Sequence, residues 1–176
     1  MRRIATFVLA SSLASCSGGA DASVRDPGPG EATLRWEGRT HGGVTAPAVA
    51  RWCAADTLLE IVAVRGDTAF GVVLIVQDSV REGSFPVNDG RTFMAVRPQA
   101  NVALRLLKAF ELESYDAESG RVTVTQGGSR AVSGTFEARL RPVVGADSFR
   151  VTGSFERIPV SRAAGVCGRA NRPAGG

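Results

Sequence analysis

Histidine and lysine are almost absent from this sequence. Among 176 residues there is one histidine, His41, in the stretch RTHGG, and one lysine, Lys108. Hydrolases need a nucleophile beside a base, and neither a G-x-S-x-G nor an S-x-x-K pattern occurs. We therefore predict a protein that is not an enzyme and has no catalytic residues; catalysis would require His41 to lie within hydrogen-bond reach of a Ser, Thr, Asp or Glu in a cleft.

Patterns typical of metal sites are also missing. One histidine and two cysteines that we expect to be oxidised cannot supply three or four ligands for a transition metal. Four aspartates recur every eleven residues, but eleven residues is about one strand plus one turn, and no calcium-loop motif contains them. We therefore predict no metal and no cofactor, and we assign the four aspartates to turns: Asp56, Asp67, Asp78 and Asp89. A second acidic group is assigned to a solvated edge or turn rather than to a glycosidase pair: Glu111, Glu113, Asp116 and Glu118.

Aromatic residues are few, and basic residues do not cluster. Trp36, Trp52 and Tyr115 are too few for a sugar-binding surface. Trp36 is in register with Leu34 and is expected to face the core, while Trp52 adjoins Cys53. The arginines are scattered along the chain, so the net charge of +4 does not indicate nucleic-acid binding.

No apolar run in the sequence is long enough to span a membrane as a helix, and the run near the N-terminus is short. Met1 to Arg3 is cationic, and the apolar run from Ile4 to Leu13 is too short for a permanent transmembrane helix. This layout is typical of an export signal. The next residues, LASC, resemble a bacterial lipobox. This resemblance implies that residues 1–15 are a lipoprotein signal peptide and that Cys16 is lipidated.

Two or three acyl chains on Cys16 would hold the protein on a membrane, because each buried methylene contributes about 0.8 kcal/mol. We therefore expect a lipid-anchored protein of the cell envelope that faces the periplasm or the exterior. Ser17 follows the cysteine. By analogy with well-studied Gram-negative bacteria, this residue is compatible with the outer membrane if the host is Gram-negative.

The remaining chain divides by composition into three parts. Residues 16–30 are small, polar and rich in Gly and Pro, which predicts a flexible tether with a reach of about 20 Å. Residues 31–167 are expected to form a single β domain. Residues 168–176 contain too little apolar surface to join a core, and we predict a disordered tail.

Three cysteines are present, and lipidation of Cys16 would leave an even pair. In an oxidising compartment we expect Cys53 and Cys167 to form a disulfide. Two unpaired thiols are the alternative. The bridge would close a loop of more than a hundred residues, for which chain-entropy estimates give about 4 to 5 kcal/mol.

Apolar and polar residues alternate with a period of two through most of the domain, as in 32–37, 121–125 and 151–156. Turn residues separate these segments, for example Gly66-Asp67 and Gly127-Gly128. This pattern predicts an all-β protein, an antiparallel β-sandwich or a flattened β-barrel of about eight strands.

One predicted hairpin, residues 58–76, is apolar on both faces and needs a cover on its second face. Residues 101–112 are a candidate for that cover. A short helix near 101–110 would begin at Asn101 and place Val102, Leu106 and Phe110 on one side. The alternation of Val102, Leu104 and Leu106 fits a strand equally well, and both possibilities remain open.

A glycine followed two residues later by phenylalanine occurs three times, at 83–85, 134–136 and 153–155. We expect each ring to cover the space that a glycine leaves. Together with the strand GRVTVT, residues 120–125, these motifs resemble a domain-of-unknown-function family of bacterial lipoproteins, over about residues 58–160. The resemblance implies an extracytoplasmic β domain and carries no catalytic residues.

Two functional hypotheses follow. The first is a membrane-anchored, non-enzymatic β domain that acts as an envelope interaction or structural module with an unidentified protein partner; an exposed apolar patch would favour it. The alternative is a carrier for a small hydrophobic ligand in a barrel cavity above roughly 300 Å³.

Overall fold

The computed structural model describes residues 25–38, 41–89, 97–109, 111–145 and 147–163. Cys16, Cys167 and the predicted signal peptide and tail lie outside these residues. None of the described residues forms a helix long and apolar enough to cross a membrane.

The described residues form nine strands in one sheet, one more than the sequence pattern predicts, and the all-β class is confirmed. The sheet closes on itself in the order β1-β2-β3-β4-β6-β5-β7-β8-β9, with β9 pairing back to β1. Most pairs are antiparallel; β5 and β6 are parallel and share one pair, Val87 with Ala100. The strands are β1 (Glu31–Glu37), β2 (His41–Cys53), β3 (Leu58–Arg65), β4 (Thr68–Ile75), β5 (Gly83–Asn88), β6 (Gln99–Lys108), β7 (Glu111–Gln126), β8 (Ala131–Pro142) and β9 (Phe149–Arg162).

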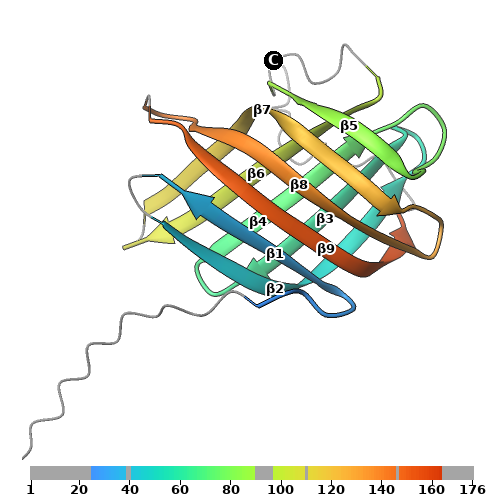
Figure 1. Ribbon diagram of the computed structural model, residues 1–176, viewed down its shortest axis with the longest axis horizontal. Coiled ribbons are helices and arrows are strands. Elements are labelled where there is room, and N and C mark those ends of the chain that lie inside the picture. The colour runs from blue at the N-terminus through green and yellow to red at the C-terminus, as the bar shows by residue number, and fades with distance from the viewer. Residues whose placement is uncertain (1–24, 39–40, 90–96, 110, 146, 164–176) are drawn as a thin grey trace, which may run out of the picture.

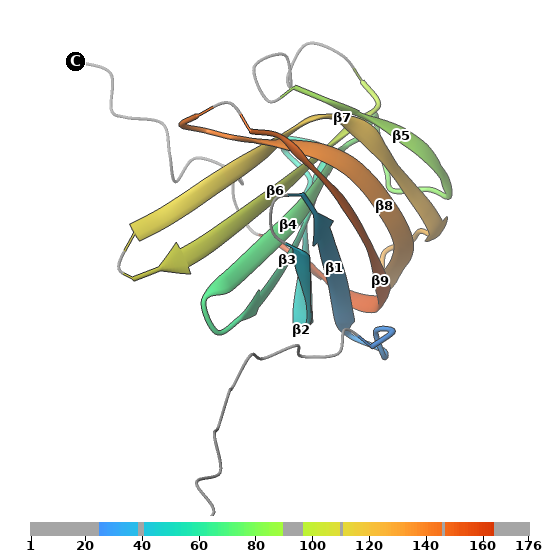
Figure 2. The same cartoon turned by 60° about the vertical axis from the view of Figure 1, so that its left-hand side comes forward.

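The ring is flattened into two layers whose strands cross (Figures 1 and 2). One layer contains β3, β4 and β6, and the other contains β1, β8 and β9. The long strands β2 and β7 belong to both layers: residues 41–47 of β2 pair with β1 and residues 48–53 pair with β3. In β7, a register shift between Ala117 and Ser119 marks the bend. The sheet therefore turns its corners within strands.

The core fills the space between the two layers. Inward residues alternate with outward ones along each strand, so Ala100, Val102 and Leu104 of β6 are fully buried while Leu107 is exposed. The rings of Phe70 in β4 and Phe136 in β8 meet across the interior with centroids 6.4 Å apart.

The possible helix near 101–110 is not formed, because residues 99–108 are strand β6. Residues 99–106 pair with β4 on one side, and residues 103–108 pair with β7 on the other. The two ladders pair every residue of the strand on at least one side, whereas a helix would leave the neighbouring strands with free edges. Of the two possibilities that the sequence left open, the strand is therefore correct.

The glycine and phenylalanine motifs of β8 and β9 cover each other across the strands. Phe136 lies opposite Gly153, and Gly134 lies opposite Phe155. A Cβ added to Gly134 would lie 2.6 Å from the Phe155 ring, so each ring occupies the space above the partner strand's glycine. In these two motifs each ring covers a glycine, as predicted, but the glycine belongs to the motif on the neighbouring strand.

The two ends of the flattened barrel differ. At one end, which we call the hairpin end, the chain turns between β1 and β2, β3 and β4, β6 and β7, and β8 and β9 (Figure 1). At the other, which we call the open end, lie the turns 54–57 and 127–130, the connection 76–82 and the last residues of β9.

Candidate functional site

Large aliphatic side chains are exposed at the hairpin end. Leu107 and Leu112 are direct partners in the β6–β7 ladder and lie on the same outward face. The turn after β8 adds two consecutive valines, and the Val143 amide donates to the Ser114 carbonyl (2.8 Å), which holds this turn beside β7. We call these four residues the aliphatic patch, with exposed fractions as follows: Leu107 47%, Leu112 61%, Val143 62% and Val144 90%.

A groove of about 440 Å³ runs beside this patch, and Leu112, Val143 and Val144 form part of its lining. Tyr115 also lines the groove, and its ring meets Phe149 edge to face with centroids 4.9 Å apart. The groove therefore has aliphatic walls and an aromatic contact that ties β7 to the start of β9.

A polar group flanks the groove. The Glu113 carboxylate accepts a hydrogen bond from the Tyr115 hydroxyl (2.7 Å) and forms an ion pair with Lys108 (2.8 Å). The hydrogen bond from Lys108, followed by that from Tyr115, lowers the pKa of Glu113. Burial, followed by the hydrogen bond to Glu113, raises the pKa of Tyr115 to about 12. Glu113 is thus held as an anion, and Tyr115 as a neutral donor.

A second hollow of about 220 Å³ adjoins the groove and shares Pro142 and Val143 with it. Its lining is more polar. Arg141 lies 3.5 Å from Glu118 and 3.7 Å from Asp89, and Asp116 is paired with Arg105 (2.9 Å). These ion pairs place charge of both signs beside the aliphatic patch, as expected of the rim of a protein interface.

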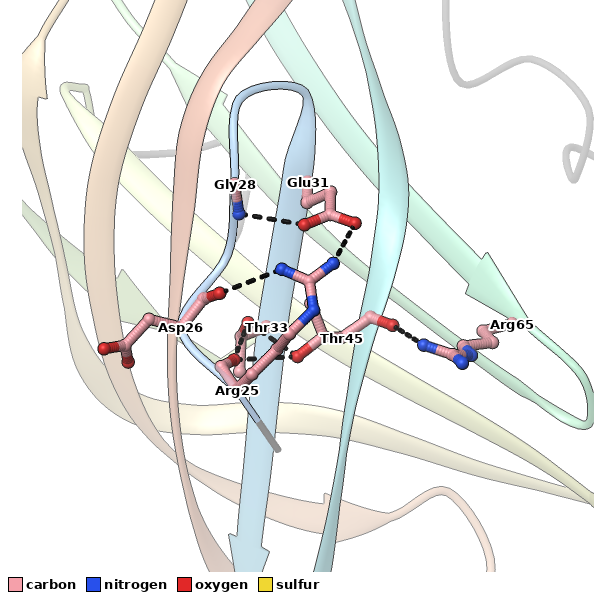
Figure 3. Close-up of polar contacts among 7 residues, drawn as sticks. All are labelled: Arg25, Asp26, Gly28, Glu31, Thr33, Thr45 and Arg65. Carbon is pink, nitrogen blue, oxygen red and sulfur yellow. Dashed lines mark hydrogen bonds and ion pairs between the residues drawn. The ribbon is translucent and has the colours of Figure 1, made fainter. Parts of the chain in front are cut away.

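A separate polar cluster fastens the start of the described chain to the outer face of β1 and β2 (Figure 3). The Thr45 hydroxyl donates to the Arg25 carbonyl (2.9 Å). Thr33 lies 3.1 Å from the Thr45 oxygen and 3.3 Å from that carbonyl, so its hydroxyl hydrogen can serve either. Both threonines are buried although they point outward from the barrel, because residue 25 covers them. We call Arg25, Gly28, Glu31, Thr33 and Thr45 the Arg25 cluster.

The side chain of Arg25 closes this cluster. Its guanidinium donates to Glu31 (2.6 Å), whose second oxygen accepts from the Gly28 amide (2.8 Å). These two hydrogen bonds lower the pKa of Glu31, with that from Arg25 as the larger cause. Arg65 adds a hydrogen bond to the Thr45 carbonyl (2.7 Å). Residues 25–30, which we assigned to the tether, therefore lie against the barrel.

The residues that the sequence singled out for possible chemistry are not gathered in one place. His41 is exposed at the first residue of β2, and no hydrogen bond or ion pair joins it to another described side chain. Cys53 is fully buried at the end of β2 and has an interaction partner. Because Cys167 lies outside the described residues, the disulfide stays a prediction, as does lipidation of Cys16.

Neither of the two acidic groups forms a cluster of free carboxylates among the described residues. The four aspartates at eleven-residue intervals all lie in connections between strands, as predicted for turns. In the second group, Glu113, Asp116 and Glu118 each pair with a cation, which removes them as a free carboxylate pair. Within the described ranges, no three or more His, Cys, Asp and Glu side chains are placed to hold a metal ion.

The aliphatic patch was not identified from the sequence. Its clearest signal is the pair Val143-Val144 between Pro142 and Gly145, a turn in which polar residues are usual. Leu107 and Leu112 carried no such signal, because a leucine in a strand is normally assigned to the core.

No protein-family model, no curated protein and no solved structure matches this chain. The resemblance to a lipoprotein family therefore stays a prediction, and the functional argument depends on the geometry of the molecule.

Proposed function

We propose that this protein is a membrane-anchored, extracytoplasmic interaction module that docks a protein of the cell envelope through its aliphatic patch. The observation that carries the proposal is the exposure of four large aliphatic side chains beside a groove. Large apolar side chains gathered on an exposed surface and rimmed by polar residues commonly mark a protein interaction site.

The composition of the patch favours a protein partner. Its centre is aliphatic, and its margin carries the paired charges Lys108–Glu113 and Arg105–Asp116. A partner with an apolar centre can bury the aliphatic side chains, while the surrounding ion pairs remain in contact with water and orient the complex.

The Arg25 cluster supports the anchored arrangement. If Cys16 carries the lipid, only residues 17–24 separate it from the point where Arg25 is held on the barrel. Eight residues of this small, polar composition have a root-mean-square reach of about 16 Å. The module would therefore lie close to the membrane surface, within reach of partner proteins that are at or near the same membrane.

The proposal is tested by photo-crosslinking in the host membrane from a photoreactive residue at position 144. We expect an adduct of one size from position 144 and none of that size from position 49. Val49 is the matched control because it is also an exposed valine, at 68%, but it lies on β2 away from the patch.

A second comparison separates docking from chance proximity. Leu112→Asp should abolish the adduct, while Val49→Asp, at an exposed position of β2, should leave it unchanged. Both variants should melt close to the parent protein. Equal crosslinking from positions 144 and 49, or an adduct that survives Leu112→Asp, would contradict the proposal.

A further inference from the structure

A third hollow, which has an apolar wall, lies at the open end of the barrel, opposite the aliphatic patch. Its volume is about 370 Å³, within the range of small-molecule sites in proteins. Strands β2, β3 and β9 form one side, and the connections after β4 and β7 contribute Val80 and Ser129. Barrel mouths of this kind are common ligand sites.

Three side chains of the wall form a row across neighbouring strands. Trp52 lies opposite Leu59 in the antiparallel β2–β3 ladder and opposite Arg162 in the parallel β2–β9 ladder. Residues that are directly opposite in a ladder point to the same face of the sheet. An aliphatic, an aromatic and a cationic side chain therefore stand side by side on the face that lines the hollow, and Val160 extends the apolar part.

The backbone holds this wall in place. The Ala163 amide donates to the Trp52 carbonyl (2.9 Å), the Ser161 hydroxyl donates to the Ala50 carbonyl (3.0 Å), and the Val160 amide donates to the Arg130 carbonyl (2.9 Å). The end of β9 is thus fixed both to β2 and to the turn before β8. A ligand would meet a largely preformed surface, which lowers the entropy cost of binding.

The charges around the hollow select the sign of a ligand. Asp78 lines it, but its carboxylate is already paired with Arg81 (3.0 Å) and accepts from the Ser79 amide (2.8 Å). Arg162 has no ion-pair partner among the described residues. With Asp78 and Arg81 neutralising each other, Arg162 leaves one positive charge beside an apolar wall.

We infer that this hollow binds a small amphiphile with an anionic head and an apolar body, such as a medium-chain carboxylate. The carboxylate lies against the Arg162 guanidinium, which is suited to such groups, and the chain packs on the partly exposed Trp52 and Val160, with the buried Leu59 behind them. This site differs from the cavity that the carrier hypothesis placed inside the barrel, and it does not depend on the proposed docking function.

The test uses decanoate as the probe and decan-1-ol as its uncharged match, with intrinsic fluorescence as the readout. Decanoate should give a saturable change that is lost in Trp52→Phe and kept in Trp36→Phe, because Trp36 lies at the hairpin end. The affinity for decanoate should exceed that for decan-1-ol by about three- to tenfold, as expected for a partly exposed charge-assisted contact.

Arg162→Gln should remove this difference by weakening decanoate alone. Arg121→Gln is the matched control, since Arg121 is an exposed strand arginine of β7 that does not line the hollow. Equal affinities for acid and alcohol in the parent protein, no saturable change from Trp52, or an Arg162→Gln variant that binds decanoate as the parent does would each overturn the inference.

Discussion

The ring of Phe136 lies over Gly153, its direct partner in the β8–β9 ladder. Two residues further along the ladder the arrangement is reversed, with Phe155 over Gly134. Each aromatic ring thus fills the space where the opposite strand has no side chain, and both rings are buried in the core. The two glycines are therefore part of the packing of the core, and a larger residue at either position has no room.

Gly153→Ala should destabilise the barrel. The added methyl would overlap both the Phe136 ring and the Thr33 carbonyl oxygen of β1, and the backbone cannot move aside without breaking the ladder. Overpacking of this kind costs about 1–3 kcal/mol, or about 3–10 °C in melting temperature. Gly128→Ala is the control, since the nearest atom to its added Cβ is 4.0 Å away. Similar melting of both variants would contradict the proposed packing.

Tyr115 should titrate with a pKa of about 12, because burial and the Glu113 carboxylate both disfavour the tyrosinate. It is the only tyrosine, so tyrosinate absorbance reports on it alone. Glu113→Gln removes the smaller cause, and the pKa should fall while remaining above its ordinary value. Since the folded pKa is raised, the stabilisation is complete below about pH 10 and is lost as the pH rises towards 12. An ordinary pKa in the folded parent protein would refute this contact.

Arg25→Gln should raise the pKa of Glu31, which NMR titration of the carboxyl group can measure. In the parent protein this pKa lies below the ordinary 4.5, first because of the hydrogen bond from Arg25. A lowered pKa stabilises the fold above pH 4.5, and this contribution is lost as the pH falls through the folded pKa. The stability difference between parent and variant should therefore shrink in acid. Arg150→Gln, which breaks a separate pair with Glu137, should leave Glu31 unchanged.

Cys53→Ser should lower the melting temperature by several degrees or more if Cys53 and Cys167 form a disulfide, because the bridge would close a loop of more than a hundred residues. A reductant should bring the parent protein to the same melting temperature. Serine at position 53 also places a hydroxyl in a fully buried position, so Cys167→Ser is the cleaner variant and should have a similar effect. A melting curve of Cys167→Ser that matches the parent would exclude the bridge.

Mass spectrometry of the mature protein from its host should show that residues 1–15 are absent and that the N-terminal residue is an acylated Cys16. Cys16→Ser should remove the acyl mass and release the protein from the membrane fraction, because without the cysteine sulfur no acyl chains are attached to hold the protein in the bilayer. An unmodified amino terminus at another residue would refute the lipoprotein prediction.

Much of the secondary structure was predictable from local pattern. The hairpin at Gly66-Asp67, the strands around Val122 and Val151 and the turn positions of the aspartates all follow from alternation and turn chemistry, which depend on neighbouring residues. Residues 99–108 were ambiguous because their apolar spacing fits two periods. The ambiguity was resolved by pairing with β4 and β7, which the segment itself does not encode.

The sequence by itself determined an all-β protein, the turns that separate its strands and the alternation that divides inward from outward residues. Only the tertiary structure decided the ring order, in which β5 leaves β4 and pairs with β7. It also decided that Leu107 and Leu112 face solvent and that Arg162 stands beside Trp52. The physical reason is that alternation is a local property, whereas pairing and register join residues far apart in the chain, and both candidate sites arise from such pairings.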